Sequence, residues 1–190
     1  MLYLALFRVS TLRSGVVNTM TPALLDDIDS YRVYFDTMYV GGIPRLLNED
    51  GAYLSFLAIV SATDALSGLF APSKVAGERF RAFVETYFPE DHRPHAARLW
   101  ELRNLIVHSF NPGPYFSLSY HTSRQHLKSP VGQVILNAED LFAALLMASR
   151  AYFDALLLDP ILQDNFKKRV GAADGGAPEV WVLQQHPRSQ

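Results

Sequence analysis

Apolar residues recur at helical spacing in several segments of the chain, and glycine or proline separates one segment from the next. The pattern predicts helices over residues 22–40, 53–70, 78–88, 99–110 and 138–158. Residues 161–170 add a final turn or two after Asp159-Pro160. Two short alternating runs, 115–121 and 131–136, predict a β-hairpin lying against the helices. We therefore expect an all-α bundle of about five helices with a small β-hairpin insert.

The run of residues 53–70 is nearly continuous in apolar and small side chains and has the length of a membrane span. Asp64, Ser61 and Gly68 within it favour instead a helix at the centre of the bundle, since no second span or flanking positive cluster supports a membrane. A buried carboxylate is costly without a partner. Asp64 is therefore expected to form a cap or to pair with an arginine, and a catalytic role is the alternative.

Composition is that of one globular domain. The chain has 190 residues, 49% hydrophobic and 19% charged, which suffices for a substantial core. We expect residues 20–170 to form this domain, preceded by an amino-terminal extension over 1–19 and followed by a flexible tail over 171–190. Met20 is an alternative start to Met1. The apolar segment Val180–Leu183 within the tail docks either on its own domain or on a partner.

The net charge and the residue types present exclude several kinds of functional site. A net charge of −2 provides no global basic field, so any contact with RNA must be local. The absence of cysteine excludes disulfides, thiolate zinc sites and cysteine nucleophiles, and fits a cytoplasmic protein. His92 and His95 could bind a metal ion, but no third ligand is evident, so we expect neither a metal nor another cofactor.

The candidate chemistry lies on the helix predicted over 99–110. Apolar residues share one face and polar residues the opposite one, with Arg103 between the two faces. The apolar face holds Leu99, Leu102, Ile106 and Phe110, and the polar face holds Glu101, Asn104 and His108. The helix must end soon after His108, because Asn111-Pro112-Gly113-Pro114 follows. A histidine is thereby placed in the last turn.

The sequence Arg103-Asn104, three apolar residues and then His108 (RNLIVH) resembles the signature of the HEPN superfamily. In that signature an arginine, usually followed by a polar residue, precedes a histidine near the end of a helix. The resemblance covers about residues 53–170. It implies a metal-independent endoribonuclease, often a toxin or defence effector, whose active site forms where two such helices meet in a dimer. Other members of the superfamily have lost catalysis and only bind.

On this resemblance Arg103, His108 and Asn104 are the candidate catalytic residues, and Asp64, Glu101 and Ser109 are supporting candidates. RNA cleavage without a metal needs a group that moves protons near neutral pH, which histidine provides. It also needs a cation against the phosphorane, for which a two-pronged guanidinium is suited. Asn104, four residues before His108, could orient the imidazole or hold a phosphate oxygen.

Arg103 is rotated roughly 140° from His108 around the helix, so a symmetric partner helix is expected to complete the cleft. The expected partners are thus a second copy of the chain, RNA or a nucleotide, and an antitoxin protein, with no membrane. One alternative is a non-catalytic module that binds a nucleotide or a partner in the same groove. A purely structural dimer is another, in which Arg103 pairs with Glu101 or Asp64 and His108 caps the helix.

Overall fold

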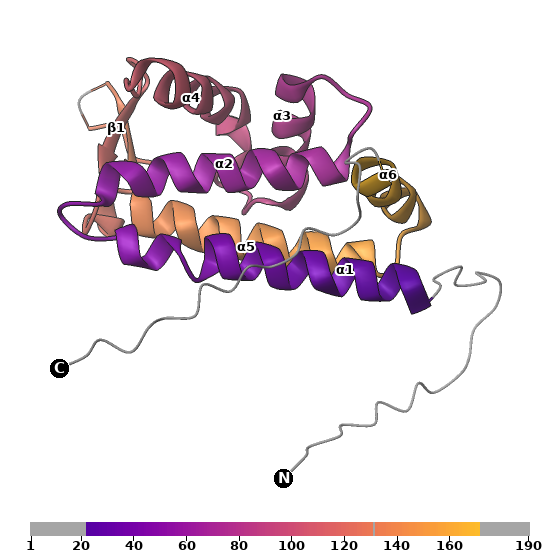
Figure 1. Ribbon diagram of the computed structural model, residues 1–190. Coiled ribbons are helices and arrows are strands. Elements are labelled where there is room, and N and C mark those ends of the chain that lie inside the picture. The colour runs from indigo at the N-terminus through magenta and orange to yellow at the C-terminus, as the bar shows by residue number, and fades with distance from the viewer. Residues whose placement is uncertain (1–21, 131, 172–190) are drawn as a thin grey trace, which may run out of the picture.

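The computed structural model describes residues 22–130 and 132–171 (Figure 1). Within these ranges the chain forms six α-helices and two short strands. They are α1 (Pro22–Phe35), α2 (Ala52–Phe70), α3 (Ala76–Tyr87), α4 (Ala96–Ser109), β1 (Phe116–Ser119), β2 (Val134–Asn137), α5 (Ala138–Leu156) and α6 (Pro160–Gly171). The predicted mainly helical fold is confirmed. The expected extension and most of the expected tail, Val180–Leu183 included, lie outside the described residues.

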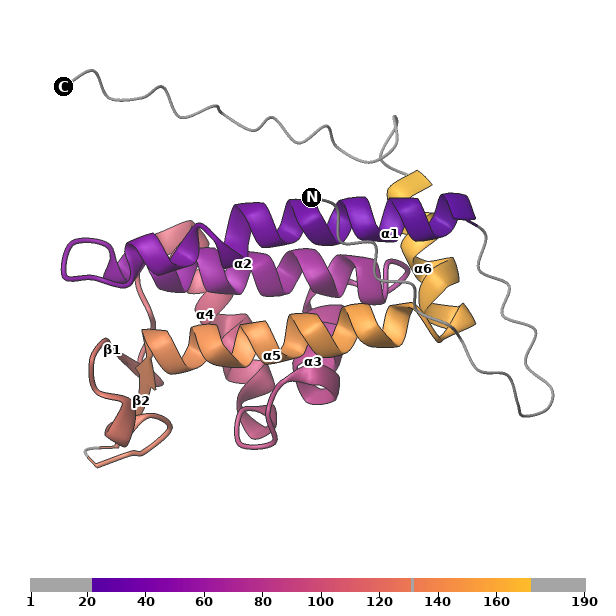
Figure 2. The same cartoon turned by 90° about the horizontal axis from the view of Figure 1, so that it is seen from below.

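Helices α1, α2 and α5 run side by side along the length of the molecule, and α3 and α4 lie on the side of α2 away from α1 (Figures 1 and 2). Helix α5 begins where predicted, because the Asn137 side chain accepts a hydrogen bond from the backbone N–H of Asp140 at 3.1 Å. At Asp159-Pro160 the chain turns by 103° into α6. This last helix is longer than the turn or two expected.

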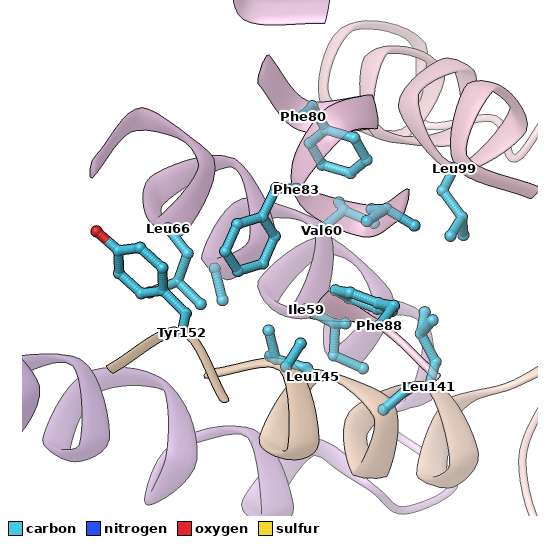
Figure 3. Close-up of a cluster of buried hydrophobic side chains, with 14 of the residues drawn as sticks. Ile59, Val60, Leu66, Phe80, Phe83, Phe88, Leu99, Leu141, Leu145 and Tyr152 are labelled. Atoms are coloured by element: carbon cyan, nitrogen blue, oxygen red, sulfur yellow. The ribbon is translucent and has the colours of Figure 1, made fainter. Parts of the chain in front are cut away.

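Helix α2 is the centre of the bundle. It packs against α3, α4, α5 and α6, and Figure 3 shows its side chains meeting those of its neighbours. The labelled residues of this cluster are Ile59, Val60, Leu66, Phe80, Phe83, Phe88, Leu99, Leu141, Leu145 and Tyr152. By length and composition α2 could cross a membrane, but half of the apolar stretch that would do so is buried inside the protein. It is thus the central bundle helix that its embedded polar residues indicate.

The predicted β-hairpin is wrong. Strands β1 and β2 are parallel, with Phe116 opposite Val134 and Ser119 opposite Asn137. Parallel strands cannot be joined by a tight turn, and the chain instead makes a long excursion that includes residues 120–130. On this path the backbone N–H of Leu127 donates to the carbonyl of Ile135 at 2.8 Å. The excursion therefore covers the second edge of β2.

A chain of hydrogen bonds through His126 and His92, the histidine chain, connects β2 to the segment before α4. The backbone N–H of Asn137 donates to Nδ1 of His126 at 3.0 Å, so neutral His126 carries its proton on Nε2. That Nε2–H donates to Nε2 of His92 at 3.0 Å. His92 in turn donates from Nδ1 to the Asp91 carboxylate at 2.7 Å. All four ring nitrogens are thereby engaged, and an added proton on either ring must break one link.

This histidine chain makes stability depend on pH. Burial, and then the charge of His92, lower the pKa of His126, against smaller opposing effects of Asp140 and Asp91. Burial and His92 likewise lower the pKa of the neighbouring His95. Just below the ordinary histidine pKa of about 6.5 the unfolded chain therefore binds more protons than the folded chain. Stability is thus fully present above that pH and is lost as the pH falls toward the lowered values.

We expect the free energy of unfolding, measured by urea denaturation, to decrease from pH 7 to pH 5. In His126→Asn the decrease should be shallower, although not abolished, because His95 still contributes. The slope is informative even if the variant is less stable at every pH. The control is His108→Asn, which alters a histidine that is not hydrogen-bonded to His92 or His126, and it should keep the wild-type slope. A wild-type slope in His126→Asn would contradict the assignment.

Candidate functional site

Helix α4 carries the motif and ends abruptly. Leu99, Leu102 and Ile106 are buried as predicted. Phe110, expected on the same apolar face, is instead 80% exposed. The reason is that the helix stops at Ser109 and Phe110 adopts a left-handed conformation with φ of 50°, its N–H bonded to the Leu105 carbonyl. This turn directs the aromatic ring away from the core.

Arg103 is held by a carboxylate from the central helix. Its Nη2 donates to Asp64 Oδ2 at 2.8 Å, which provides the arginine partner expected for this acid. A second arginine, Arg79 of α3, lies on the other side, with Nη2 3.8 Å from Asp64 Oδ1. The side chains of Asp64, Arg79 and Arg103 are 16%, 18% and 23% exposed. Asp64 therefore joins α2, α3 and α4 through one partly buried cluster.

This cluster has more positive charge than negative charge, since two guanidinium groups share one carboxylate. Nε of Arg79, Nε of Arg103 and Oδ1 of Asp64 are buried and make no hydrogen bond with the described residues. A distance of 3.8 Å is too long for a hydrogen bond. These Nε atoms are buried, and it is the excess of positive charge that makes the site electrostatically suited to an anionic group.

Trp100 sets the orientation of Arg103. The guanidinium carbon of Arg103 lies 5.4 Å from the centre of the indole ring, within the range of a cation–π contact. The ring also packs on Phe80 of α3, with centroids 5.4 Å apart. Gly77 permits this packing, because a Cβ there would lie 2.9 Å from Nε1 of Trp100. Close approach of α3 and α4 therefore depends on the absence of a side chain at Gly77.

Gly77→Ala is expected to destabilise the fold by about 1 kcal/mol. Alanine gains roughly 1 kcal/mol of helix propensity over glycine, but overpacking against the indole costs about 1–3 kcal/mol. The matched control is Gly171→Ala, where a Cβ meets nothing within 4 Å, and it should not be destabilised. Thermal unfolding of both variants checks the difference. A more stable Gly77→Ala would show that the indole moves aside easily.

The remaining candidate residues are placed differently from one another. His108 lies in the last turn of α4 and is exposed, and among the described residues nothing hydrogen-bonds to its ring. Asn104 accepts a hydrogen bond from Arg103 Nη1 at 3.2 Å and makes none to His108. Glu101 pairs with Arg98 at 2.7 Å, so it is not the partner of Arg103. Ser109 is exposed at the helix end. A single chain therefore groups Arg103, Asn104 and Asp64 and leaves His108 apart.

Arg79 was not among the residues singled out from the sequence. One signal was available, because Arg79 precedes the buried Phe83 by four residues and so lies near the core-facing side of its helix. An arginine at such a position needs a carboxylate or an aromatic ring nearby. Which carboxylate it meets depends on how α3 packs on α2, and spacing along the chain does not encode that.

The histidines considered as metal ligands have separate partners. His92 is hydrogen-bonded to His126, whereas Nδ1 of His95 lies 3.0 Å from the hydroxyl of Tyr115. Among residues 22–130 and 132–171 no group of three or more histidine, aspartate or glutamate side chains is arranged to hold a metal ion. No model of a known protein family, no curated protein and no solved structure matches this chain.

Proposed function

We propose that the protein is a metal-independent endoribonuclease of the HEPN kind, whose site is composed of two α4 helices from two copies of the chain. The observation that carries the proposal is the disposition of α4. His108 is exposed at its end without a partner among the described residues, while Arg103 is fixed on another face by Asp64. The reactive groups are present, but one copy alone does not bring them together.

The chemistry requires few groups. A base takes the proton of a ribose 2′-hydroxyl, O2′ forms a bond to phosphorus, and the bond from phosphorus to the 5′-oxygen breaks. The leaving oxygen receives a proton, which yields a 2′,3′-cyclic phosphate and a 5′-hydroxyl. Two copies of His108 would supply the base and the acid. Arg103 would stabilise the charge on the phosphorane oxygens.

A dimer through α4 is supported by the apolar surface around its end. Phe110 is 80% exposed, and the adjacent Val107 is only half-buried within the single chain. Aromatic residues are enriched at the contact surfaces between proteins. In a two-fold dimer built on this surface, each copy would place its histidine near the other copy.

A second function is favoured by a different observation. Arg103 is already bonded to Asp64 and to Asn104, which lowers its freedom to follow a phosphate through a reaction. The cluster with Arg79 would then bind a nucleotide, RNA or an antitoxin protein without turnover. In that case Arg103→Ala should abolish RNA binding, and neither the wild type nor His108→Ala should cleave.

The test is incubation of the purified protein with a mixed RNA pool in EDTA, with analysis of the product ends. The proposal expects cleavage to persist and to leave 2′,3′-cyclic phosphate ends. Light scattering at micromolar concentration should report a dimer. Retained RNA binding without cleavage would favour the binding module, and a monomer would contradict the composite site.

A further inference from the structure

A cavity is lined by residues of α1, of the turn that follows it and of α5. Helices α1 and α5 lie on the side of α2 away from α4 (Figures 1 and 2). The cavity has a volume of about 70 Å³, several times the roughly 10–15 Å³ that one water molecule requires. The cavity can therefore admit a small polar group, but not a whole nucleotide. It is separate from the Arg103 cluster and has no part in the proposed cleavage.

The cavity coincides with an unusual stretch of helix. After Phe35 the chain continues as a π-helix over Asp36–Val40, and the N–H of Gly41 bonds to the carbonyl of Asp36, five residues back, at 2.8 Å. Such wide turns are rare and are found frequently at functional sites. Asp36 and Val40, one turn apart, both line the cavity. The widened turn thus places a carboxylate at its edge.

Two arginines border the cavity from opposite helices. Arg32 comes from α1 and Arg150 from α5. Arg150 is exposed and has no hydrogen bond or ion pair with any residue that the structure describes. Arg32 is engaged only loosely: Asp154 lies 3.6 Å away, the two side chains are 38% and 69% exposed, and the guanidinium carbon lies 5.8 Å from the centre of the Phe153 ring. An exposed pair of this kind contributes little. Both guanidinium groups are therefore able to bind one oxyanion.

Asp36 would repel an anion that offers only acceptor atoms. A carboxylate can nevertheless accept a hydrogen bond from an anion that carries a proton of its own. Near neutral pH every inorganic phosphate ion keeps at least one P–OH group and phosphate monoesters keep theirs in part of the population, whereas sulfate has no proton to donate. The hydroxyl of Ser149, which is only 3% exposed and donates to the Leu146 carbonyl at 3.0 Å, can also accept from such a group.

We propose that this cavity is a binding site for a protonated phosphate group, held by Arg32 and Arg150 and distinguished from sulfate by Asp36. The site takes either free phosphate or the terminal group of a phosphate monoester, which share this chemistry. The two arginines attract the anion, and the Asp36 carboxylate makes the site prefer a protonated phosphate group to sulfate. The inference goes beyond the proposed ribonuclease and does not depend on it.

Isothermal titration calorimetry with inorganic phosphate, methyl phosphate and sulfate at equal ionic strength tests the site. The wild type should bind phosphate at least about tenfold more tightly than sulfate, because one lost hydrogen bond to a charged group corresponds to roughly that factor. Comparable binding of methyl phosphate would identify a monoester as the occupant. Rejection of methyl phosphate would identify the free ion.

Two variants within the cavity and two controls complete the test. Arg150→Gln should lose most of the phosphate binding, and Asp36→Asn should bind sulfate nearly as well as phosphate. Arg124→Gln and Lys128→Gln each remove an exposed positive charge outside the cavity, so both should bind phosphate like the wild type. Equal wild-type affinity for the two anions would overturn the proposal. Phosphate binding that persists in Arg150→Gln would also overturn it.

Discussion

His108→Ala is expected to lower the rate of RNA cleavage by about 100-fold or more, the usual contribution of a positioned acid or base. The free energy of unfolding should stay within about 0.5 kcal/mol of the wild type, because a surface substitution away from packed groups has little effect. His108 is exposed and makes no hydrogen bond or ion pair with the described residues. Cleavage in EDTA and urea denaturation on the same preparation measure the two effects.

His121→Ala is a suitable control, because it removes another exposed histidine, with a side chain 68% exposed, that pairs with Glu139 of α5 and does not lie on α4. It should cleave RNA like the wild type. Arg103→Lys should be severely impaired, since an ammonium lacks the two-pronged geometry that matches a phosphate. Equal cleavage by the wild type and His108→Ala would indicate a contaminating nuclease or another site.

Asp64→Ala should destabilise the fold by about 3 kcal/mol, the largest loss of stability that we expect from a substitution in the cluster. The change leaves Arg79 and Arg103 without their shared counter-charge, although their side chains are only 18% and 23% exposed. Urea denaturation at pH 7 measures the loss. Most of it reflects the cost of two partly buried charges left without a partner, and the pair itself contributes less.

The matched control is Glu101→Ala, which breaks the ion pair with Arg98 between side chains that are 43% and 52% exposed. This exposed pair should cost no more than about 0.5 kcal/mol. Removing Arg79 in the Asp64→Ala background, as Asp64→Ala/Arg79→Gln, should recover part of the stability, because one uncompensated charge is gone. A double variant less stable than Asp64→Ala would contradict the role given to Arg79.

The sequence was most informative where local signals agree. Helix α2 was predicted over 53–70 and spans Ala52–Phe70, because a continuous apolar run is followed closely by a proline. The beginning of α5 was predicted from Asn137 and Asp140, whose hydrogen bond is local. Both features depend on residues a few positions apart. Such features can be read from a sequence without knowledge of the fold.

Features that depend on distant residues could not be read in the same way. The alternating pattern of β1 and β2 indicates strands but not their relative direction, which depends on the path of the chain between them. The pairing of Asp64 with an arginine was expected, whereas the presence of Arg79 beside it requires the packing of α3. The hydrogen bonds that run from Asn137 through His126 and His92 to Asp91 likewise connect segments whose contact no periodicity of the sequence predicts.

If the proposed dimer forms, Phe110 would make the stability of this protein depend on its concentration. Its left-handed conformation is one that glycine adopts more easily, so the isolated chain gives up about 1 kcal/mol or more to keep a phenyl ring there. A second copy that buries the phenyl ring would offset this conformational cost, but only while it is bound. Association and stability would then be linked by mass action. A dilute sample would melt at a lower temperature than a concentrated one, with no change in sequence.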